Sequence, residues 1–504
     1  MPMQLSPPDE HNQLLVAHAH PPEWANPQPA GRYNLVAVGG GTAGIIAALG
    51  AAGLGGRAAL VERHLLGGDC LNVGCVPSKA LLSAARAAYL LTQSEQFGFR
   101  LAGPPQIDFA AIMQRMRRMR AEISRHDSAQ RFRGLNVDVY FGQAAFTGRD
   151  TIEVAGQELR FHRAVIATGS RPTIPPIAGL DATDCLTSET IFSLTELPRR
   201  LIVIGGGPVG CELGQAFRRF GSEVHIVQRS KALLPKEPLE ASLLVQAQFE
   251  REGVHLHLGW ATQAIEKVGD SKSLVIERQG EKRKLIADAI LVAAGRTPNL
   301  DGLGLEAAGV RTTRDGIEVN DRLQTANPRV FAAGDVCSSY KFTHAADATA
   351  RLCLRNALFF GRKKLSSLVI PRCTYTDPAV AHVGLTAAEA SERGIEVDSY
   401  RVDLAEVDRA LVDGDETGFA VVHVRRGTGK IVGATVVARE AGELIAEMVL
   451  LMTNRRSLAD LARTIHCYPT QSEIWKRIAD NYTRARFTPT IARAVGRWLA
   501  WWRR

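Results

Sequence analysis

The chain has 504 residues, of which 45% are apolar and 22% charged, and it carries a formal net charge of +9. This composition is that of a folded protein of two to four domains, because one hydrophobic core seldom serves more than about 300 residues. No motif of basic and interleaved aromatic residues accompanies the charge, and no apolar run reaches 18 residues, so we predict neither nucleic-acid binding nor a membrane span.

Residues 1–31 hold several prolines together with His11, His18 and His20, without any helical or strand period. We therefore predict a flexible N-terminal tail. Three histidines could also indicate a metal site, but their irregular spacing favours a solvated tail.

Residues 35–62 and 201–228 are two copies of one pattern: an apolar strand, a glycine turn, a helix and a second strand. Each copy carries G-x-G-x-x-G in register, which makes the pattern far more specific than a single glycine triplet. Such glycines let backbone N–H groups and a helix N-terminus approach a pyrophosphate. The sequence therefore predicts two dinucleotide sites, at Gly39, Gly41 and Gly44 and at Gly205, Gly207 and Gly210.

Eight cysteines without a secretory segment at the N-terminus predict a cytoplasmic protein. Two of them, Cys70 and Cys75, stand in a C-x4-C segment directly after the first glycine unit. Gly68 and Gly74 allow a tight backbone, and Pro77 suits the opening of a helix that carries Lys79. A helix N-terminus and a nearby ammonium group favour a thiolate, so the segment predicts a redox dithiol.

Two other interpretations of these cysteines are structural thiols and half of a zinc site. Zinc would require two more ligands at short spacing, and the remaining six cysteines are scattered singly along the chain. We therefore predict no resident metal site.

The two glycine units differ at the end of their second strands. Glu62 occupies the place where a carboxylate binds ribose hydroxyls, whereas the matching residue of the second unit is Gln228. Arg229 and Lys231 follow Gln228, and cations there would attract a 2′-phosphate. The second site is therefore predicted to prefer NADPH, with NADH as the alternative.

The pattern changes from about residue 371 onward. Short alternating strands such as 419–424 and 431–437 are followed by helices, which indicates a separate α+β domain. After residue 483 the chain holds six arginines, no acid and three of its six tryptophans. This composition resembles an interfacial anchor on anionic lipid, and a C-terminal helix that docks on a dimer is the alternative.

Taken together, the dithiol segment, the twin glycine turns, Ala167-Thr168-Gly169 and Ala333-Gly334-Asp335 resemble the pyridine nucleotide-disulfide oxidoreductases. This family includes glutathione reductase, dihydrolipoyl dehydrogenase and mercuric reductase, and the resemblance covers roughly residues 32–483. It implies an α/β fold with two Rossmann-like, doubly wound dinucleotide-binding domains and a C-terminal α+β dimerisation domain. The implied domains are FAD-binding (32–175 and 300–370), NAD(P)H-binding (176–299), interface (371–483) and an Arg/Trp-rich tail (484–504).

The resemblance also implies a role for individual residues. Cys75 would lie nearest the flavin and Cys70 would be the interchange thiol, while Lys79 and Glu212 match an ion pair near flavin N5. Asp335 would bind FAD, and the helix after His344 would direct its N-terminus at the flavin. Further cofactor-binding positions implied by the motifs are Gly68, Thr168, Gly169, Gly295 and Gly334.

The C-terminal motif departs from the disulfide-reducing members, which carry H-P-T-x-x-E with a histidine base. Here Tyr468 occupies the base position of the run that ends at Glu473. A tyrosine is a poor proton shuttle at neutral pH, and mercuric reductases carry one at this place. His466, two residues earlier, is the alternative base.

We therefore predict a homodimeric FAD- and NADPH-dependent enzyme of the mercuric reductase-like branch that reduces a soft metal ion or another small oxidant. The chain lacks a cysteine pair at residues 497–504, where mercuric reductases deliver the metal. The alternatives are a disulfide reductase of the dihydrolipoyl dehydrogenase or glutathione reductase type, and a membrane-associated electron-transfer or redox-sensing flavoprotein.

Overall fold

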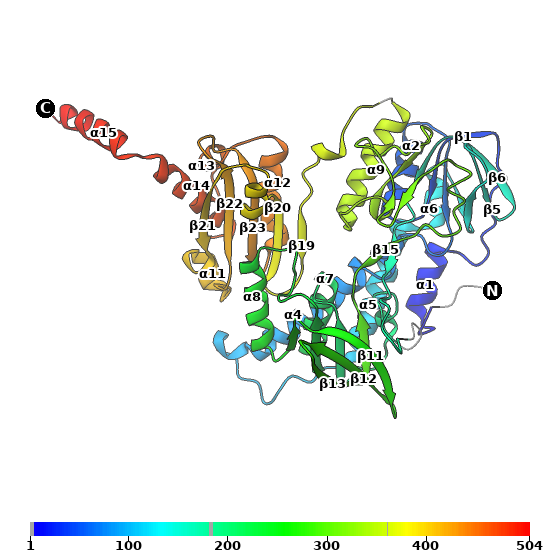
Figure 1. Ribbon diagram of the computed structural model, residues 1–504, viewed down its shortest axis with the longest axis horizontal. Helices are drawn as coiled ribbons and strands as arrows, with labels where there is room; N and C mark the ends of the chain where they lie inside the picture. Colours follow the sequence, from blue (N-terminus) through cyan, green and yellow to red (C-terminus); the bar gives the residue numbers. More distant parts are fainter. Residues whose placement is uncertain (1–4, 181–184, 360, 504) are drawn as a thin grey trace. The chain divides into compact units, whose positions relative to one another are not determined.

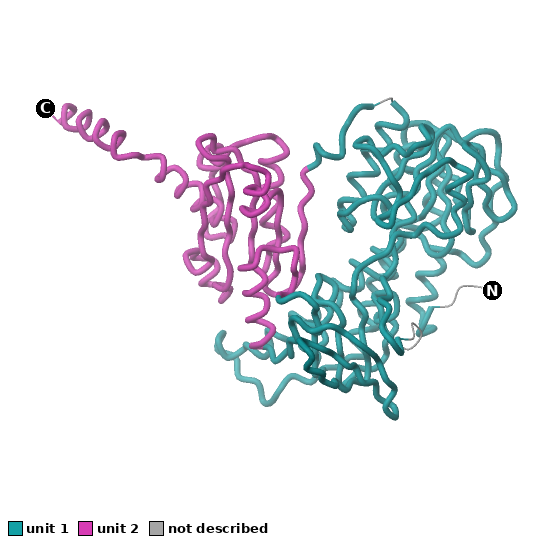
Figure 2. The backbone as a smooth tube through the Cα atoms, in the orientation of Figure 1, with its two compact units in different colours: residues 1–231, 252–368 teal, residues 232–251, 369–504 magenta. Residues whose placement is uncertain are grey.

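A computed structural model describes residues 5–180, 185–359 and 361–503. The chain divides into two compact units, shown in different colours in Figure 2. Unit 1 comprises residues 1–231 and 252–368, and unit 2 comprises residues 232–251 and 369–504.

The first sheet of unit 1 has the strand order β3-β2-β1-β6-β5-β4, with β18 paired to β6. Figure 1 labels β1, β6 and β5 of this sheet. Its central strands are parallel, and β1 lies between β2 and β6. Apolar residues on both faces of β1 are fully buried, as expected of a parallel sheet covered on both sides. The strands are β1 (Arg32–Val38), β2 (Ala58–Glu62), β3 (Val137–Phe141), β4 (Ala144–Phe146), β5 (Thr151–Val154), β6 (Gln157–Ile166) and β18 (Val330–Ala332).

Helices α2 and α9 pack against each other and contribute to the core beside this sheet. Both are rich in alanine, which lets helix and sheet backbones approach closely. The helices of this part are α2 (Thr42–Gly53), α3 (Gly68–Asn72), α4 (Cys75–Thr92), α5 (Phe109–Ser124), α6 (Ala129–Gly134) and α9 (Thr343–Leu358).

The second glycine unit forms another parallel sheet, with the order β10-β9-β8-β14. An antiparallel sheet of β11, β12 and β13 lies between β10 and β14 in the chain, and β7 pairs with β15. These elements are β7 (Ser170–Pro172), β8 (Arg200–Ile204), α7 (Pro208–Phe220), β9 (Glu223–Gln228), β10 (His255–Leu258), β11 (Ala261–Val268), β12 (Ser271–Arg278), β13 (Glu281–Ala287), β14 (Ala289–Val292), β15 (Arg296–Pro298), β16 (Thr312–Thr313) and β17 (Gly316–Ile317). The two glycine units thus have the predicted α/β architecture.

The N-terminal segment differs from the predicted flexible tail, because helix α1 (Glu10–Ala19) packs against α5. Asp9 caps the helix by accepting from the Asn12 N–H at 2.8 Å, and Leu15 is 1% exposed. The Arg120 guanidinium donates to the Asn12 side chain at 2.6 Å. Tertiary burial of one apolar face therefore orders a segment whose prolines indicated irregular structure.

Unit 2 is built on an antiparallel sheet with the order β19-β20-β23-β22-β21. Helices α12, α13 and α14 contribute to its core, where Trp475 is fully buried and donates its indole N–H to the Leu444 carbonyl at 3.0 Å. The strands are β19 (Arg372–Thr374), β20 (Ala379–Gly384), β21 (Val397–Asp403), β22 (Phe419–Arg425) and β23 (Ile431–Ala438), and the helices are α10 (Ala387–Glu392), α11 (Asp408–Asp413), α12 (Ala441–Thr453), α13 (Leu458–Ala462) and α14 (Glu473–Arg486).

One helix groups differently from the sequence expectation. Helix α8 (Leu239–Arg251) lies within the predicted 176–299 domain, but residues 232–251 group with unit 2. The Arg372 guanidinium of β19 donates to Glu237 at 2.8 Å, which ties the two segments of unit 2 together.

The Arg/Trp-rich segment is helical: α14 continues to Arg486, and α15 (Pro489–Trp502) follows. Thr488 caps α15 by accepting from the Ile491 N–H, and α15 has no buried residue. Among the residues that the structure describes, none of the helices combines the length and apolarity needed to span a bilayer.

Candidate functional site

The two cysteines of the C-x4-C segment lie on consecutive helices of unit 1, the five-residue α3 and the 18-residue α4. Cys70 is in α3 and Cys75 is the first residue of α4, so this helix begins two residues before Pro77. Gly74 joins the helices where an added Cβ would meet the Asp69 carbonyl oxygen at 2.7 Å. Only glycine fits there without a shift of the backbone, and this close turn places Cys75 at a helix N-terminus.

The sulfur of Cys75 lies in an environment that favours its thiolate. Hydrogen bonding from Cys70 is the main cause that lowers the pKa of Cys75 to about 6, and the Thr343 hydroxyl and the Lys79 charge act in the same direction. The Cys75 Sγ and Thr343 Oγ1 atoms are 3.2 Å apart. The same hydrogen bond and burial raise the pKa of Cys70, so the proton of the pair resides on Cys70. Both thiols are free, and Cys75 is exposed.

Alkylation of Cys75 by iodoacetamide is therefore expected to show a midpoint near pH 6, the value to which its pKa is lowered. The thiolate is the reactive form, so the rate should fall about tenfold for each pH unit below the midpoint. Mass spectrometry of the reduced protein after timed alkylation would measure the rate at each cysteine. Thr343→Val removes one hydroxyl and should move the midpoint upward. An unchanged midpoint in this variant would contradict the role of the Thr343 hydrogen bond.

Lys79 and Glu212, which the sequence analysis paired, do lie together. Lys79 Nζ is 2.8 Å from Glu212 Oε2, and α4 packs against α7. The Glu212 side chain is 7% exposed and the Lys79 side chain 38%, so the carboxylate is the buried partner. Removing either charge would leave the other without its compensating partner in this contact.

The backbone of the first glycine turn, at Gly39 and Gly44, is closely approached by other backbone atoms. A Cβ at Gly44 would meet the Gly39 carbonyl oxygen at 1.8 Å, and one at Gly39 would meet the Ala167 carbonyl oxygen at 2.4 Å. No side chain caps the N-terminus of α2, which follows Gly41. The N–H groups of this first helical turn are therefore not capped by a side chain, and such groups can bind an anion.

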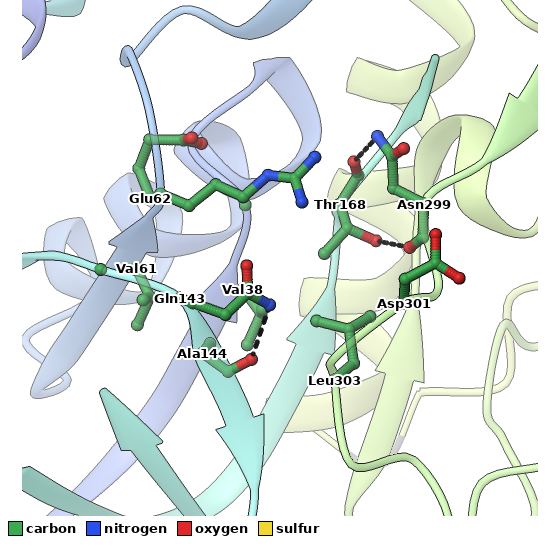
Figure 3. A pocket seen from close by; sticks show the side chains of 12 residues that line it. Val38, Val61, Glu62, Gln143, Ala144, Thr168, Asn299, Asp301 and Leu303 are labelled. Carbon is green, nitrogen blue, oxygen red and sulfur yellow. Dashed lines mark hydrogen bonds between the residues drawn. The ribbon is translucent and has the colours of Figure 1, made fainter. Parts of the chain in front are cut away.

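A pocket opens beside this turn, with Glu62 on one side and Thr168 and Asn299 on the other (Figure 3). The Thr168 hydroxyl donates to the Asn299 carbonyl at 2.8 Å, and the Asn299 amide donates to the Thr168 carbonyl at 2.9 Å. Glu62 accepts from the Gly40 N–H at 2.6 Å, and burial raises the pKa of this carboxyl. The lining residues are Val38, Gly39, Val61, Glu62, Arg63, Gly142, Gln143, Ala144, Thr168, Asn299, Asp301 and Leu303.

Asp335 lies in a polar cluster that joins several predicted positions. It accepts from the Ser170 hydroxyl at 2.6 Å, and its carboxylate lies 3.6 Å from the Arg296 guanidinium. Arg296 also pairs with Asp69, next to Cys70. Three glycines of this region have left-handed φ values: Gly169 (+67°), Gly295 (+117°) and Gly334 (+78°).

Sequence reasoning missed Thr343 and Arg296. Thr343 opens α9 one residue before the predicted His344, which is exposed and stacks on Phe342. Arg296 directly follows the predicted Gly295, but its partner Asp69 lies 227 residues away. No local signal marks either residue, because each acquires its contacts only when distant segments of unit 1 come together.

The second glycine turn repeats the first. A Cβ at Gly210 would meet the Gly205 carbonyl oxygen at 2.0 Å, and α7 begins after Gly207 without a side-chain cap. Gln228 accepts from the Gly206 N–H at 3.1 Å, as Glu62 does from Gly40 in the first turn. Arg229 is exposed.

In unit 2, the predicted Tyr468 is 71% exposed, and its hydroxyl donates to Asp408 at 2.9 Å. This hydrogen bond raises the pKa of Tyr468 above its usual range. Arg477 links Asp408 to the predicted Glu473, at 3.3 and 3.0 Å.

The alternative base, His466, is turned toward α12. Its Nε2 lies 3.1 Å from Glu447, its Nδ1 is buried without a hydrogen-bond partner, and its side chain is 8% exposed. Nδ1 of His466 is thus buried, and Glu447 occupies its Nε2.

Comparison with known proteins assigns the family. Residues 33–350 match the pyridine nucleotide-disulphide oxidoreductases, and residues 370–479 match the dimerisation domain of the same name. The chain belongs to this family. Pyridine nucleotide-disulphide oxidoreductases use FAD and NAD(P)H, so the predicted cofactors are confirmed at that level, and the dimerisation domain supports a homodimer.

Relatives within the family differ in substrate. The chain is 35% identical to a mercuric reductase from Lysinibacillus sphaericus, over 88% of this chain and 81% of the relative. It is 36% identical to a dihydrolipoyl dehydrogenase from Thermus scotoductus, over 88% and 95%. Among solved structures, the Cu(II) complex of the HOCl-induced flavoprotein disulfide reductase RclA from Escherichia coli aligns with a TM-score of 0.80 at 26% identity, over 90% of this chain and 99% of that one.

Proposed function

We propose that this flavoprotein oxidoreductase uses NADPH to reduce a soft metal ion at Cys70 and Cys75, in the manner of the mercuric reductases. The observation that carries the proposal is Tyr468, which stands where disulfide-reducing members carry a histidine base. Its hydroxyl donates to Asp408, and this bond raises its pKa, so it remains protonated at neutral pH. Transfer of electrons to a metal ion requires no proton shuttle, whereas reduction of a disulfide to two thiols does.

The enclosure of His466 supports the same choice. Its side chain is 8% exposed, its Nδ1 is buried, and Glu447 occupies its Nε2. A base must reach the proton that it transfers, and His466 lacks that access in this arrangement. The relatives named mercuric reductase and the Cu(II) complex of RclA are consistent with a metal substrate, but they do not by themselves assign one to this chain.

The residues of the two glycine turns fit the dinucleotides that the family uses. Carbonyl oxygens within 2.4 Å of a Cβ at Gly39 or Gly205 leave no room for side chains, and the helix that follows each turn is uncapped. Glu62 would hold the FAD ribose in the first site. Gln228 with exposed Arg229 would accept a 2′-phosphate in the second, which favours NADPH over NADH.

When bound, FAD would supply the two-electron link between NADPH and the dithiol. Over one cycle NADPH gives up two electrons and leaves as NADP⁺ and H⁺, and Hg(II) takes both electrons and leaves as Hg(0). Cys75 holds the thiolate and Cys70 holds the proton of the pair, so Cys75 is the sulfur that is ready to bind the metal. The Lys79 charge stabilises that thiolate, and Thr343 donates to it.

Anaerobic stopped-flow absorbance would test the proposal. The FAD-loaded protein is reduced with NADPH or NADH, and then mixed with Hg(II), Cu(II), lipoamide or glutathione disulfide. We expect a long-wavelength band between thiolate and flavin that only the metal ions discharge within a catalytic turnover. Rapid discharge by either disulfide would contradict the proposal and favour a disulfide reductase.

Tyr468→His is expected to increase disulfide turnover by about 10² to 10⁴-fold, the usual contribution of a positioned acid–base group. Tyr468→Phe is the matched control, because it removes the hydroxyl without adding a base. Steady-state reduction of lipoamide and glutathione disulfide by the two variants measures the difference. Equal rates in both variants would show that a proton shuttle at residue 468 does not limit disulfide reduction.

A second candidate role, membrane association, is favoured by helix α15. Ile491, Val495, Trp498, Leu499 and Trp502 recur at helical spacing along one side of α15, and Trp498 and Trp502 stack at 5.4 Å. The Trp502 side chain is 71% exposed. Exposed tryptophans beside arginines are typical of helices that lie in the interface of an anionic bilayer.

The full-length protein is expected to co-sediment with vesicles that contain phosphatidylserine and to stay in solution with phosphatidylcholine alone. Deletion of residues 488–504 should abolish the binding, because it removes the exposed tryptophans and four of the six terminal arginines. Quantitative sedimentation at low and physiological salt measures the fraction of protein bound to the vesicles. Co-sedimentation that survives the deletion would remove α15 from this role.

A further inference from the structure

Four polar side chains that take no part in the proposed reaction gather at one edge of the second parallel sheet. Glu223 and His225 alternate along β9, and His255 and His257 alternate along β10, the edge strand. Because side chains two residues apart in a strand point to the same face, each pair shares a face. His255 lies opposite His225 in the parallel register, which brings the two pairs together.

The donor atoms of three of these side chains converge. Atoms of Glu223, His225 and His255 all lie within 4.8 Å of one another. His225 Nε2 is 3.0 Å from Glu223 Oε1, and the His225 and His255 rings stack at 4.6 Å. Ligands of a tetrahedral zinc ion stand about 3.3 Å apart, since each bond is about 2.0 Å long. The first pair already meets that separation, and a rotation of the exposed His255 side chain would bring in the third ligand.

His257 fixes the orientation of His225 from the other side. The His225 Nδ1 and His257 Nε2 atoms are 3.0 Å apart, so one proton is shared between them. When that proton is on His225 Nδ1, the Nε2 atom of His225 carries a lone pair directed at the Glu223 carboxylate. A cation placed between Nε2 and the carboxylate satisfies both, and a ligating histidine commonly donates its other N–H to a neighbour in this way.

The neighbouring positive charge is already balanced. Arg200 lies opposite Glu223 in the register of β8 and β9, but its guanidinium pairs with Asp288 at 2.6 Å. The Glu223 side chain is 52% exposed and the His225 side chain 16%, so an ion can enter from solvent and retain water ligands.

We propose that Glu223, His225 and His255 bind a divalent transition-metal ion of borderline softness, such as Zn²⁺ or Cu²⁺, with His257 as a positioning residue. Imidazole and carboxylate ligands suit these ions, whereas a thiolate pair suits Hg²⁺. The site departs from the sequence prediction of no metal site. His225 precedes Gln228 by three residues, about 10 Å along the strand, so a metal here bridges β9 and β10 away from the nucleotide turn.

Isothermal titration of Zn²⁺ into the FAD-loaded full-length protein tests the site, with accessible thiols blocked by N-ethylmaleimide so that cysteines do not compete. We expect saturable binding of one ion per chain and a higher melting temperature. His255→Ala and Glu223→Gln should each weaken binding at least about tenfold, and His257→Ala should weaken it about tenfold. His162→Ala is the matched control, because His162 is an exposed strand histidine of β6 outside the cluster, and it should bind as the wild type does.

Electron paramagnetic resonance with one equivalent of Cu²⁺ provides a second readout, in which the nitrogen couplings of bound imidazole should be present in the wild type and reduced in His255→Ala. Flavin content and circular dichroism verify that each variant is folded. The proposal is overturned if the wild type shows no saturable Zn²⁺ binding, or if His255→Ala and Glu223→Gln bind as tightly as His162→Ala. Neither result depends on which oxidant the dithiol reduces, so failure here is distinguishable from failure of the proposed reaction.

Discussion

Cys75→Ser is expected to lower turnover of Hg(II) or any other dithiol-dependent oxidant by at least about 10³-fold, as loss of a reacting nucleophile typically does. The Cys75 thiolate is the only one of the pair present at neutral pH, because the Cys70 hydrogen bond lowers the pKa of Cys75 to about 6. A serine hydroxyl at this place stays protonated and cannot form a disulfide. Steady-state NADPH oxidation with each oxidant measures the loss.

Cys70→Ser is the informative partner of this variant. It should lose turnover to a similar extent, because no disulfide can form. Its Cys75 should still be alkylated at pH 7, because the serine hydroxyl can donate in place of the Cys70 thiol and the Thr343 hydroxyl and the Lys79 charge remain. NADPH-dependent reduction of an artificial dye that accepts electrons directly from flavin should persist in both variants. Loss of dye reduction would mean that the substitution had damaged the cofactor sites, and oxidant turnover near the wild-type rate in Cys75→Ser would contradict the dithiol mechanism.

Gly44→Ala is expected to destabilise unit 1 by about 3 kcal/mol or more and to release FAD, at the upper end of overpacking effects. The added methyl group would stand 1.8 Å from the Gly39 carbonyl oxygen, which belongs to the turn that we propose binds the FAD pyrophosphate. Relief of this steric clash requires α2 and the glycine turn to move apart. Thermal unfolding and the ratio of flavin to protein absorbance measure the two effects.

Gly53→Ala is the matched control for this prediction. Gly53 is the last residue of the same helix, α2, and nothing lies within 4 Å of a Cβ there. Alanine in a helix is more stable than glycine by roughly 0.5–1 kcal/mol, so this variant should unfold at the same temperature or slightly higher. Full flavin retention by Gly44→Ala would show that the first glycine turn does not need the close approach of α2.

Local patterns were sufficient to predict the two nucleotide-binding units. A glycine turn between a strand and a helix is specified by neighbouring residues, because the close approach of Gly44 to the Gly39 carbonyl oxygen involves atoms near in the chain. The C-x4-C segment and the tyrosine at residue 468 could be predicted for the same reason, because each is recognised from neighbouring residues in the sequence. The family resemblance added the Lys79–Glu212 pair, whose members are 133 residues apart and meet at 2.8 Å.

The sequence alone misjudged segments whose structure depends on distant partners. Residues 10–19 contain little helical periodicity, yet α1 packs against α5, Leu15 is buried in the core, and Arg120 binds Asn12, which together order the helix. Residues 232–251 follow the second glycine unit in the chain, but they group with unit 2, where Glu237 pairs with Arg372 across 135 residues.

The sequence by itself determined the chemistry available to this protein: two glycine turns, a dithiol and a tyrosine in the place of a base. Only the tertiary structure decided the surroundings of those groups. Thr343 contacts Cys75 although the two are 268 residues apart in the chain. Asp408 accepts the hydrogen bond from the Tyr468 hydroxyl 60 residues away, and β10 brings His255 beside His225. Short-range spacing fixes which groups are present, but hydrogen bonds and charge act over a few ångströms of space, and the folded chain alone sets that proximity.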